Sequence, residues 1–263
     1  MNKVGQFSHQ DIKIFLDDKV ERYNRPEFIT DDPISIPHTY NKKQDIEITA
    51  FWTAVLSWGQ RKTIINKAKS LFELMDNAPH DFIRNHSAKD LVPFETFKHR
   101  TFLSDDTLYF IAALKEIYLS HQSLEEVFVM GGQPFEMAQA LTRFHKLFFS
   151  LSEGLDRTKK HLPNPERGST CKRLNMFMRW MVRQDDKGVD FGLWKNVPKS
   201  ALMIPYDLHV DRVVRHYGLA ERQQRDWKLV EELTAFCRTL DPVDPAKYDY
   251  ALFGLSVSGE LSF

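Results

Sequence analysis

The densest group of chemically capable side chains lies in the segment DLHVDRVVRHYG, which begins at Asp207. Asp207, His209, Asp211 and His216 are of types that bind metal ions or transfer protons. Residues two apart on a helix do not share a face, so a metal could bind only where the helix begins. Asp207 stands at the N-cap position, where its carboxylate can accept from the first free backbone N–H groups. A helix cap needs no further function, and a metal-dependent phosphohydrolase that uses the other three residues is an alternative.

A second candidate is Lys172, which opens a helix with Leu174 and Phe177 on its apolar side. The positive end of the helix, with Arg173 beside it, disfavours the protonated amine. An unprotonated amine can act as a nucleophile. A lysine in the first turn of a helix is otherwise a solvated charge.

Helical spacing of apolar residues positions these candidates and runs through most of the chain. The stretch 24–37 has three prolines and predicts an extended connection, whereas 89–102 has no clear period. No alternating pattern typical of β-strands is found, so the predicted class is all-α. The predicted helices cover 8–23, 46–58, 62–75, 134–151, 207–217 and 246–257, with others that begin near 79, 104, 123, 171 and 226.

Composition limits the kind of protein. The 263 residues are 42% hydrophobic and 27% charged, which suits one large domain or two that pack closely. The two cysteines exclude a disulfide framework, a four-cysteine iron–sulfur cluster and a cysteine-based zinc site within the chain. We find neither a secretory signal nor a membrane-spanning run. We therefore expect a soluble, cytoplasmic monomer without a metal or other cofactor and without a membrane partner.

Charge is balanced overall and concentrated locally. Lysine plus arginine equals aspartate plus glutamate at 36 each, so the total gives no support for a nucleic-acid partner. From Arg157 to Arg183, however, eight basic residues stand against a single acid, Glu166. This run is either a solvated face or a surface that contacts a DNA backbone.

Three separated stretches resemble the helix-hairpin-helix DNA glycosylase superfamily, in the order of that family. AVLSWGQRKTIINKA (Ala54 to Ala68) resembles its helix-turn-helix, Lys172 with KRLNMFMRWM resembles the end of its hairpin motif, and PYDLHVDRVVRHYGL resembles the segment that supplies its aspartate. The resemblance covers most of residues 46–256. The hairpin pattern L-P-G-x-G-x-K is replaced here by NPERGSTCK, in which Lys172 lies four residues beyond Gly168 rather than two.

The archaeal 8-oxoguanine glycosylase branch of this superfamily is the most similar. The separation from Lys172 to Asp207 is longer than in the endonuclease III type, as in that branch, and DYALF from Asp249 to Phe253 is similar to its D-x-x-L-W element. The chain also resembles a group of uncharacterised bacterial proteins assigned near this branch.

The resemblance implies a DNA glycosylase that removes an oxidised purine such as 8-oxoguanine from a damaged duplex, with or without strand cleavage. Lys172 would be the nucleophile and Asp207 the catalytic carboxylate. A non-catalytic nucleic-acid-binding protein that retains the fold is the second interpretation. The base would be bound by Asp249, Phe253, Trp52, Trp58 and Phe177, and the DNA by Gln60, Arg61, Gly168 and Arg173.

Several of these residues also have a structural interpretation. The two tryptophans could be core residues, Asp249 could simply stand in the first turn of the last helix, and Phe253 could lie in the core one turn later. The resemblance further implies two helical subdomains with a cleft between them. We expect residues 46–184 to form a helical barrel that ends in the hairpin-like element, and residues 1–45 with 185–263 to form the other half, with Lys172 and Asp207 facing each other across the cleft.

Overall fold

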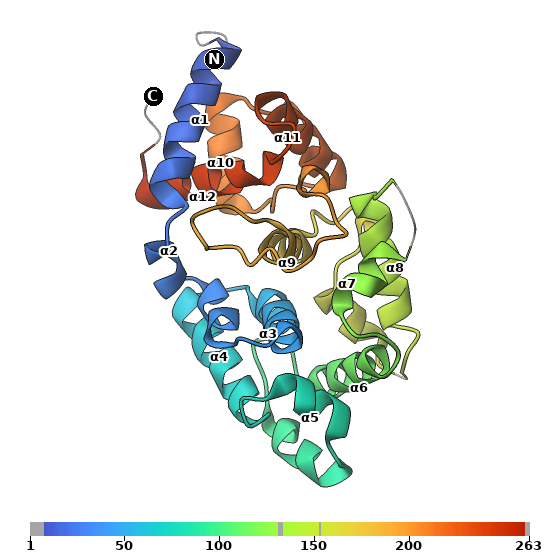
Figure 1. Cartoon of the computed structure of the whole chain (residues 1–263). Helices are drawn as coiled ribbons and strands as arrows, with labels where there is room; N and C mark the ends of the chain where they lie inside the picture. Colours follow the sequence, from blue (N-terminus) through green and yellow to red (C-terminus); the bar gives the residue numbers. More distant parts are fainter. Residues whose placement is uncertain (1–7, 131–133, 153, 261–263) are drawn as a thin grey trace. The chain divides into compact units, whose positions relative to one another are not determined.

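The computed structural model describes residues 8–130, 134–152 and 154–260, and its secondary structure is helical (Figure 1). Within these residues the only β-pairing is an isolated antiparallel bridge between His99 and Phe102. The predicted all-α class is confirmed. In the described part of the chain, none of the helices combines the length and the apolar character needed to cross a membrane.

The chain divides into two compact units. The central unit runs from Thr30 to Asn164, and the terminal unit combines the chain up to Ile29 with the chain from Pro165 onward. These boundaries differ from the expected division at 45/46 and 184/185. The hairpin-like element from Pro165 onward and the helix that begins at Lys172 belong to the same unit as the C-terminal helices.

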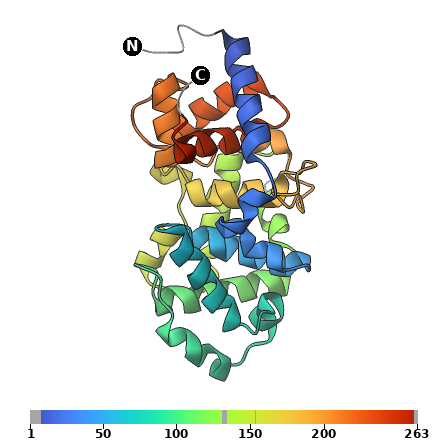
Figure 2. The ribbon, with the colours of Figure 1, turned by 90° about the vertical axis from the view of Figure 1, so that its left-hand side faces the viewer.

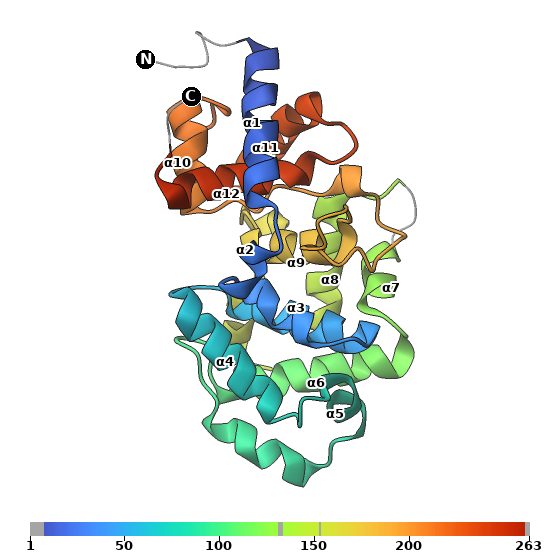
Figure 3. The ribbon, with the colours of Figure 1, turned by 60° about the vertical axis from the view of Figure 1, so that its left-hand side comes forward.

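The central unit is built around α3, in which every residue from Ile46 to Leu56 is buried. Phe51 on this helix contacts the rings of Phe110, Phe144 and Phe148, which come from two other helices. Figure 3 shows α5 beside α6, which are in contact. The helices of this unit are α3 (Lys43–Leu56), α4 (Arg61–Glu73), α5 (Pro79–Asn85), α6 (Ser104–Ser120), α7 (Leu124–Val129) and α8 (Met137–Phe148), with 3-10 turns η4 (Ala88–Thr96) and η5 (Asp156–His161).

The terminal unit places α12 between two other helices. α1 and α10 both pack on α12, and Figure 2 shows α1 in blue lying across α12 in dark red. α1 begins after Ser8, whose side chain accepts from the N–H of Asp11 in a capping box. The helices of this unit are α1 (His9–Tyr23), α9 (Lys172–Val182), α10 (Leu208–Tyr217), α11 (Trp227–Leu240) and α12 (Tyr248–Ser258).

The prediction of an extended connection over 24–37 is wrong. The segment forms a short helix α2 (Glu27–Thr30), followed by the 3-10 turns η2 (Pro33–Ser35) and η3 (Pro37–Thr39). Proline suits the first position of a helical turn, because its fixed φ is already helical and the missing N–H would have no partner there. The carboxylate of Asp32 caps η2 by accepting from the N–H of Ile34 at 3.1 Å.

Candidate active site

The residue before Lys172 sets the direction in which α9 begins. Cys171 is buried and adopts a left-handed conformation, with φ 49° and ψ 32°. Its N–H donates to the hydroxyl of Ser169 at 3.1 Å, and its carbonyl accepts from the N–H of Asn175 at 2.9 Å. Left-handed backbone is costly for a residue with a Cβ, so these contacts must hold the turn in place. Lys172 thereby becomes the first residue of the helix.

The hairpin-like element is tied to the segment that precedes Asp207. Gly168 closes a turn by donating its N–H to the carbonyl of Pro165 at 2.8 Å, with φ +73°. The hydroxyl of Thr170 donates to the carbonyl of Tyr206 at 3.2 Å, and the side-chain amide of Asn175 donates to the carbonyl of Thr170 at 3.1 Å. These bonds connect the start of α9 to the start of α10.

Asp207 is the N-cap of α10, as its position in the sequence predicts. Its Oδ1 accepts from the N–H groups of His209 at 2.8 Å and Val210 at 3.1 Å. Gly218 ends the helix in a left-handed conformation with φ +67°. Oδ1 of Asp207 is therefore held by the backbone of α10, whereas Oδ2 takes no part in the cap.

That other oxygen faces Lys172. The Nζ of Lys172 lies 3.7 Å from Oδ2 of Asp207, and these side chains are 27% and 23% exposed. The same Nζ lies 3.7 Å from the sulfur of Met176, one turn along α9. The amine and the carboxylate are thus adjacent, partly open to solvent, and both within the terminal unit. The expected cleft between two subdomains stays a prediction.

Asp249 stands in the first turn of α12 and is buried. Its carboxylate accepts an ionic hydrogen bond from the guanidinium of Arg179. Burial raises the pKa of Asp249 to about 6, and the negative charges of Asp207 and Asp190 raise it too, against the lowering effect of Arg179 and Lys172. Arg179 also donates from Nε to Asp190 at 3.3 Å. The carboxylate of Asp249 is therefore occupied by an ion pair in this structure, and its role in base binding stays a prediction.

The ion pair continues into a buried network. Arg183 follows Arg179 by one turn of α9 and lies 3.2 Å from Asp190, 3.1 Å from Asp244 and 2.8 Å from Asp185. Both guanidinium groups lie over the ring of Tyr250, at 4.3 Å for Arg179 and 5.4 Å for Arg183. The sequence analysis missed this network. The signal that could have revealed it was the spacing i, i+4 of two arginines among the apolar residues of MFMRWMVR.

Aromatic rings from α12, the first turn of α10 and α2 lie next to one another. The rings of His209 and Phe253 are 5.3 Å apart and edge-on, and Phe253 lies 6.5 Å from Phe28. His209 Nδ1 lies 3.3 Å from the hydroxyl of Ser256. Phe253 and His209 are both partly exposed, so they remain candidates for contact with a ligand at the Lys172–Asp207 pair.

Two of the other expected base-binding residues are core residues instead. Phe177 is fully buried and packs edge-on against Trp194 at 5.3 Å. Trp52 is fully buried in the central unit, at 5.8 Å from Phe102 and 5.3 Å from Phe110. Burying a large aromatic ring stabilises the fold, and neither ring can stack on a base without opening the core. The structure therefore favours a role in the core for both residues.

Trp58 is partly exposed near the end of α3, in the central unit. Its ring is edge-on to His99 and His161 at 6.0 and 6.2 Å, and the guanidinium of Arg100 lies 5.3 Å over it. Gln60 is exposed at the N-cap position of α4, where its side chain makes no capping bond.

Arg61 is partly exposed as the first residue of α4, and it lies in the central unit with Trp58 and Gln60. In the terminal unit, Gly168 is exposed with open space around its Cα, and Arg173 is partly exposed next to Lys172. Only these last two of the expected DNA-binding residues share a unit with the Lys172–Asp207 pair.

The basic run does not form one surface. Arg157 binds the buried Asp106 at 2.9 Å in the central unit, whereas Arg179 and Arg183 are buried in the terminal unit with their aspartates. Carboxylates near and distant in sequence neutralise these charges. The interpretation of the whole run as a DNA-contacting or solvated face is therefore wrong.

The metal interpretation of the segment after Tyr206 has no geometric support. Asp211 is buried and its oxygens accept from the hydroxyl of Tyr206 at 2.7 Å, from Arg215 at 3.2 Å and from Arg225 at 2.9 Å. Among the residues that the structure describes, no three histidines, cysteines, aspartates or glutamates are arranged to hold a metal ion. Asp211 thus connects α10 to Tyr206, which precedes the helix, and to Arg225, which follows it.

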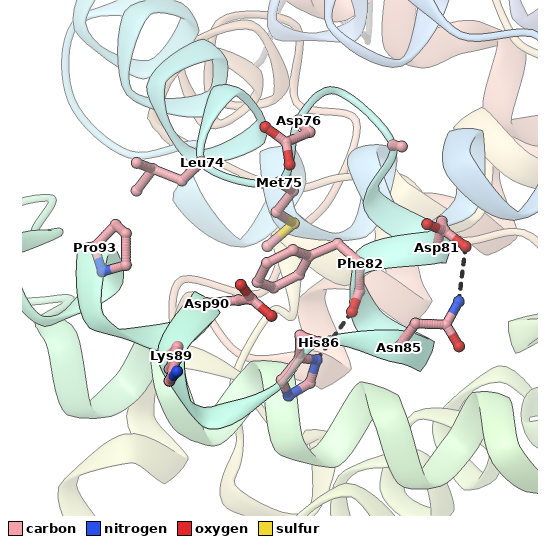
Figure 4. Close-up of a pocket in the computed structure, with 11 residues that line it drawn as sticks. Leu74, Met75, Asp76, Asp81, Phe82, Asn85, His86, Lys89, Asp90 and Pro93 are labelled. Carbon is pink, nitrogen blue, oxygen red and sulfur yellow. Dashed lines mark hydrogen bonds between the residues drawn. The ribbon is translucent and has the colours of Figure 1, made fainter.

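A separate pocket of about 430 Å³ lies in the central unit, between the end of α4, α5 and η4 (Figure 4). Met75 and Phe82 form its apolar part, and Asp76 and Asp90 line it with carboxylates. The backbone carbonyl of Phe82 lies 2.9 Å from Nδ1 of His86. No residue of the Lys172–Asp207 pair lines this pocket.

The sequence matches the family described as protein of unknown function (DUF2400) over residues 32–258, and the chain belongs to this family. The match includes Lys172, Asp207 and Asp249. No curated protein and no solved structure matches the chain.

Proposed function

We propose that this protein is a DNA N-glycosylase that removes an oxidised purine such as 8-oxoguanine, with Lys172 as nucleophile and Asp207 as the catalytic carboxylate. One observation carries the proposal: the amine of Lys172 lies 3.7 Å from Oδ2 of Asp207, at the adjoining first turns of two helices. The resemblance of three sequence segments to helix-hairpin-helix glycosylases supplies the reaction class. Damaged duplex DNA is the proposed partner.

The two groups have complementary roles in this reaction. When the bond from the sugar C1′ to the base nitrogen breaks, its electron pair leaves with the base, which takes up a proton, and positive charge develops on the sugar. The carboxylate of Asp207 stabilises that charge. The unprotonated amine of Lys172 then forms a bond to C1′, and loss of the remaining amine protons with opening of the sugar ring gives an imine. β-Elimination from the imine would break the strand.

The carboxylate is well prepared for this role. Oδ1 of Asp207 is held by two backbone N–H groups, so Oδ2 is fixed in position without needing the substrate to orient it. A base must leave the duplex stack before it can reach the pair. We assign base contact to the partly exposed ring of Phe253, with His209 beside it.

Base release and borohydride trapping on a duplex with one 8-oxoguanine test the proposal. Wild type should release the base and form a borohydride-stable cross-link, whereas Lys172→Ala should not cross-link. Lys187→Ala is the matched control, because Lys187 lies in the same unit and pairs with Glu21 at 2.8 Å, away from Asp207. The proposed activity would be refuted if the wild type showed no base release and no cross-linking.

A non-catalytic nucleic-acid-binding protein is the second candidate. The departure of the hairpin-like element from the glycosylase pattern favours it, since Cys171 stands in a left-handed turn directly before Lys172. Binding to damaged duplex that weakens steeply with salt, without base release, would support this candidate. No binding to any duplex would remove it.

A further inference from the structure

Basic residues are concentrated in two segments of the central unit. Segments 57–72 and 97–104 together hold six lysines and arginines and no aspartate or glutamate. The rest of the unit, by contrast, has ten basic residues against 17 acidic ones. The first segment covers the turn before α4 and most of that helix, and the second contains the bridge between His99 and Phe102.

Contacts between side chains bring these two segments together. Nε2 of His99 lies 3.3 Å from the carbonyl oxygen of Trp58, and the two rings are edge-on at 6.0 Å. The guanidinium of Arg100 lies over the ring of Trp58, 5.3 Å from its centre. On α4, Nζ of Lys67 lies 5.8 Å from the centre of the Phe97 ring. Basic groups from both segments therefore meet on one part of the central unit.

Arg100 is exposed, and its surroundings orient its side chain. Its backbone is left-handed, with φ 56°, which is costly for a residue with a Cβ. Two backbone hydrogen bonds between His99 and Phe102, at 2.8 and 2.9 Å, close the turn around it. The guanidinium lies against Gly59, where an added Cβ would stand 2.8 Å from Nη1, and over the Trp58 ring. The charged group is thus held at the surface before any ligand arrives.

No carboxylate neutralises these cations in the part of the chain that the structure describes. Lys67, Lys98 and Arg100 form no ion pair there. Unpaired cations beside a partly exposed aromatic ring suit the phosphate backbone of a nucleic acid. A membrane surface would also require apolar side chains, and Leu103 is the one large apolar side chain exposed in the two segments, which are described in full.

We propose that Lys67, Lys98 and Arg100, beside Trp58, form a turn surface that binds the phosphate backbone of duplex DNA, whether or not the duplex carries a lesion. The guanidinium of Arg100 can donate two N–H groups to one phosphate, and each lysine acts as a point charge. In its choice of DNA, this inference rests on the proposed function. The binding itself requires neither Lys172 nor a damaged base.

Binding of the full chain to a short undamaged duplex, measured by fluorescence anisotropy over a range of salt concentrations, tests the proposal. The variants are Lys98→Ala and Arg100→Gly, the second because glycine accepts a positive φ and leaves the turn intact. Each variant should weaken binding about fivefold at roughly 0.15 M salt. Each should also reduce the slope of log affinity against log salt by about 0.9, the value for one phosphate contact.

Lys89→Ala is the matched control for these two variants. Lys89 is an exposed lysine of the same unit, but it lines the separate pocket together with Asp76 and Asp90. Its removal should leave both the affinity and the salt slope at the wild-type values. The turn surface would be overturned if Lys98→Ala and Arg100→Gly behaved like this control. A wild type that binds anionic lipid vesicles and no duplex would overturn it as well.

Base release from an 8-oxoguanine duplex separates this inference from the proposed function. Duplex binding that depends on Lys98 and Arg100, in a wild type that releases no base, would support the turn surface and refute the glycosylase activity. Base release by a wild type whose duplex affinity is the same in both variants would support the glycosylase activity and overturn the turn surface.

Discussion

Replacing Arg179 with methionine should destabilise the protein strongly, and more at alkaline than at acid pH. Methionine is close to arginine in length but carries no charge. The substitution leaves Asp249 and Asp190 without the guanidinium that both contact, and their side chains are only 8% and 0% exposed. Removing one partner from a buried ion pair costs about 3–5 kcal/mol, because the remaining charge is neither solvated nor paired. We expect a loss of this size near pH 8.

The pH dependence follows from the sign of the Asp249 shift. A carboxyl whose folded-state pKa is raised to about 6 favours folding most at low pH, and this contribution is lost as the pH rises through that value. Without Arg179 the pKa of Asp249 rises further, because Arg179 lowers it. Near pH 5 Asp249 is then neutral in the folded variant and largely neutral in wild type. The loss of unfolding free energy at pH 5 should therefore be smaller than the loss at pH 8 by about 1–2 kcal/mol. This follows from roughly 1.4 kcal/mol for each unit by which the substitution raises the pKa of Asp249.

Urea unfolding of wild type and variant at the two pH values measures these losses. Arg22→Met is the matched control, because Arg22 forms an exposed two-bond pair with Glu260 at 2.6 and 2.7 Å. Removing such a surface pair should cost about 1 kcal/mol or less. A buried Arg179–Asp249 ion pair of this strength would be refuted if Arg179→Met lowered the free energy of unfolding no more than Arg22→Met does. It would also be refuted if Arg179→Met lowered that free energy equally at both pH values.

Two further predictions concern the ends of α10. Asp207→Ala should lose base release and about 1 kcal/mol of stability, because the helix cap is lost. Asp207→Ser should recover the stability, because serine also caps helices, but it should not recover base release. Urea unfolding and base release, measured on both variants, check this, and an active serine variant would show that the carboxylate only caps the helix. Gly218→Ala should cost about 1 kcal/mol in the same unfolding assay, because φ is +67° there, and a stabilised variant would contradict this.

Local sequence patterns were sufficient to predict the helices and caps that position the candidate site. The apolar spacing of Val210, Val213 and Val214, with Asp207 before and Gly218 after, predicts α10 because capping and helix termination depend on nearby residues. The start of α1 after Ser8 and the start of α9 at Lys172 depend on nearby residues in the same way.

Contacts between distant segments could not be predicted. Asp249 and Arg179 are 70 residues apart, so the residues around each of them do not identify the other as its partner. The same is true of Trp52, because an aromatic residue in an apolar helix suits a core and a binding surface equally well until its neighbours are known. The left-handed turn at Cys171 was also hidden, since glycine is the usual residue for that conformation.

The measurement that tests the central claim most directly is the identity of the residue that joins the DNA. Wild type is reduced with borohydride on an 8-oxoguanine duplex, digested, and examined by mass spectrometry for the modified peptide. The proposed mechanism predicts the adduct on Lys172, whose amine lies beside Asp207. An adduct on another lysine, or base release without any adduct under conditions that trap an imine, would contradict the assignment of Lys172 as the nucleophile.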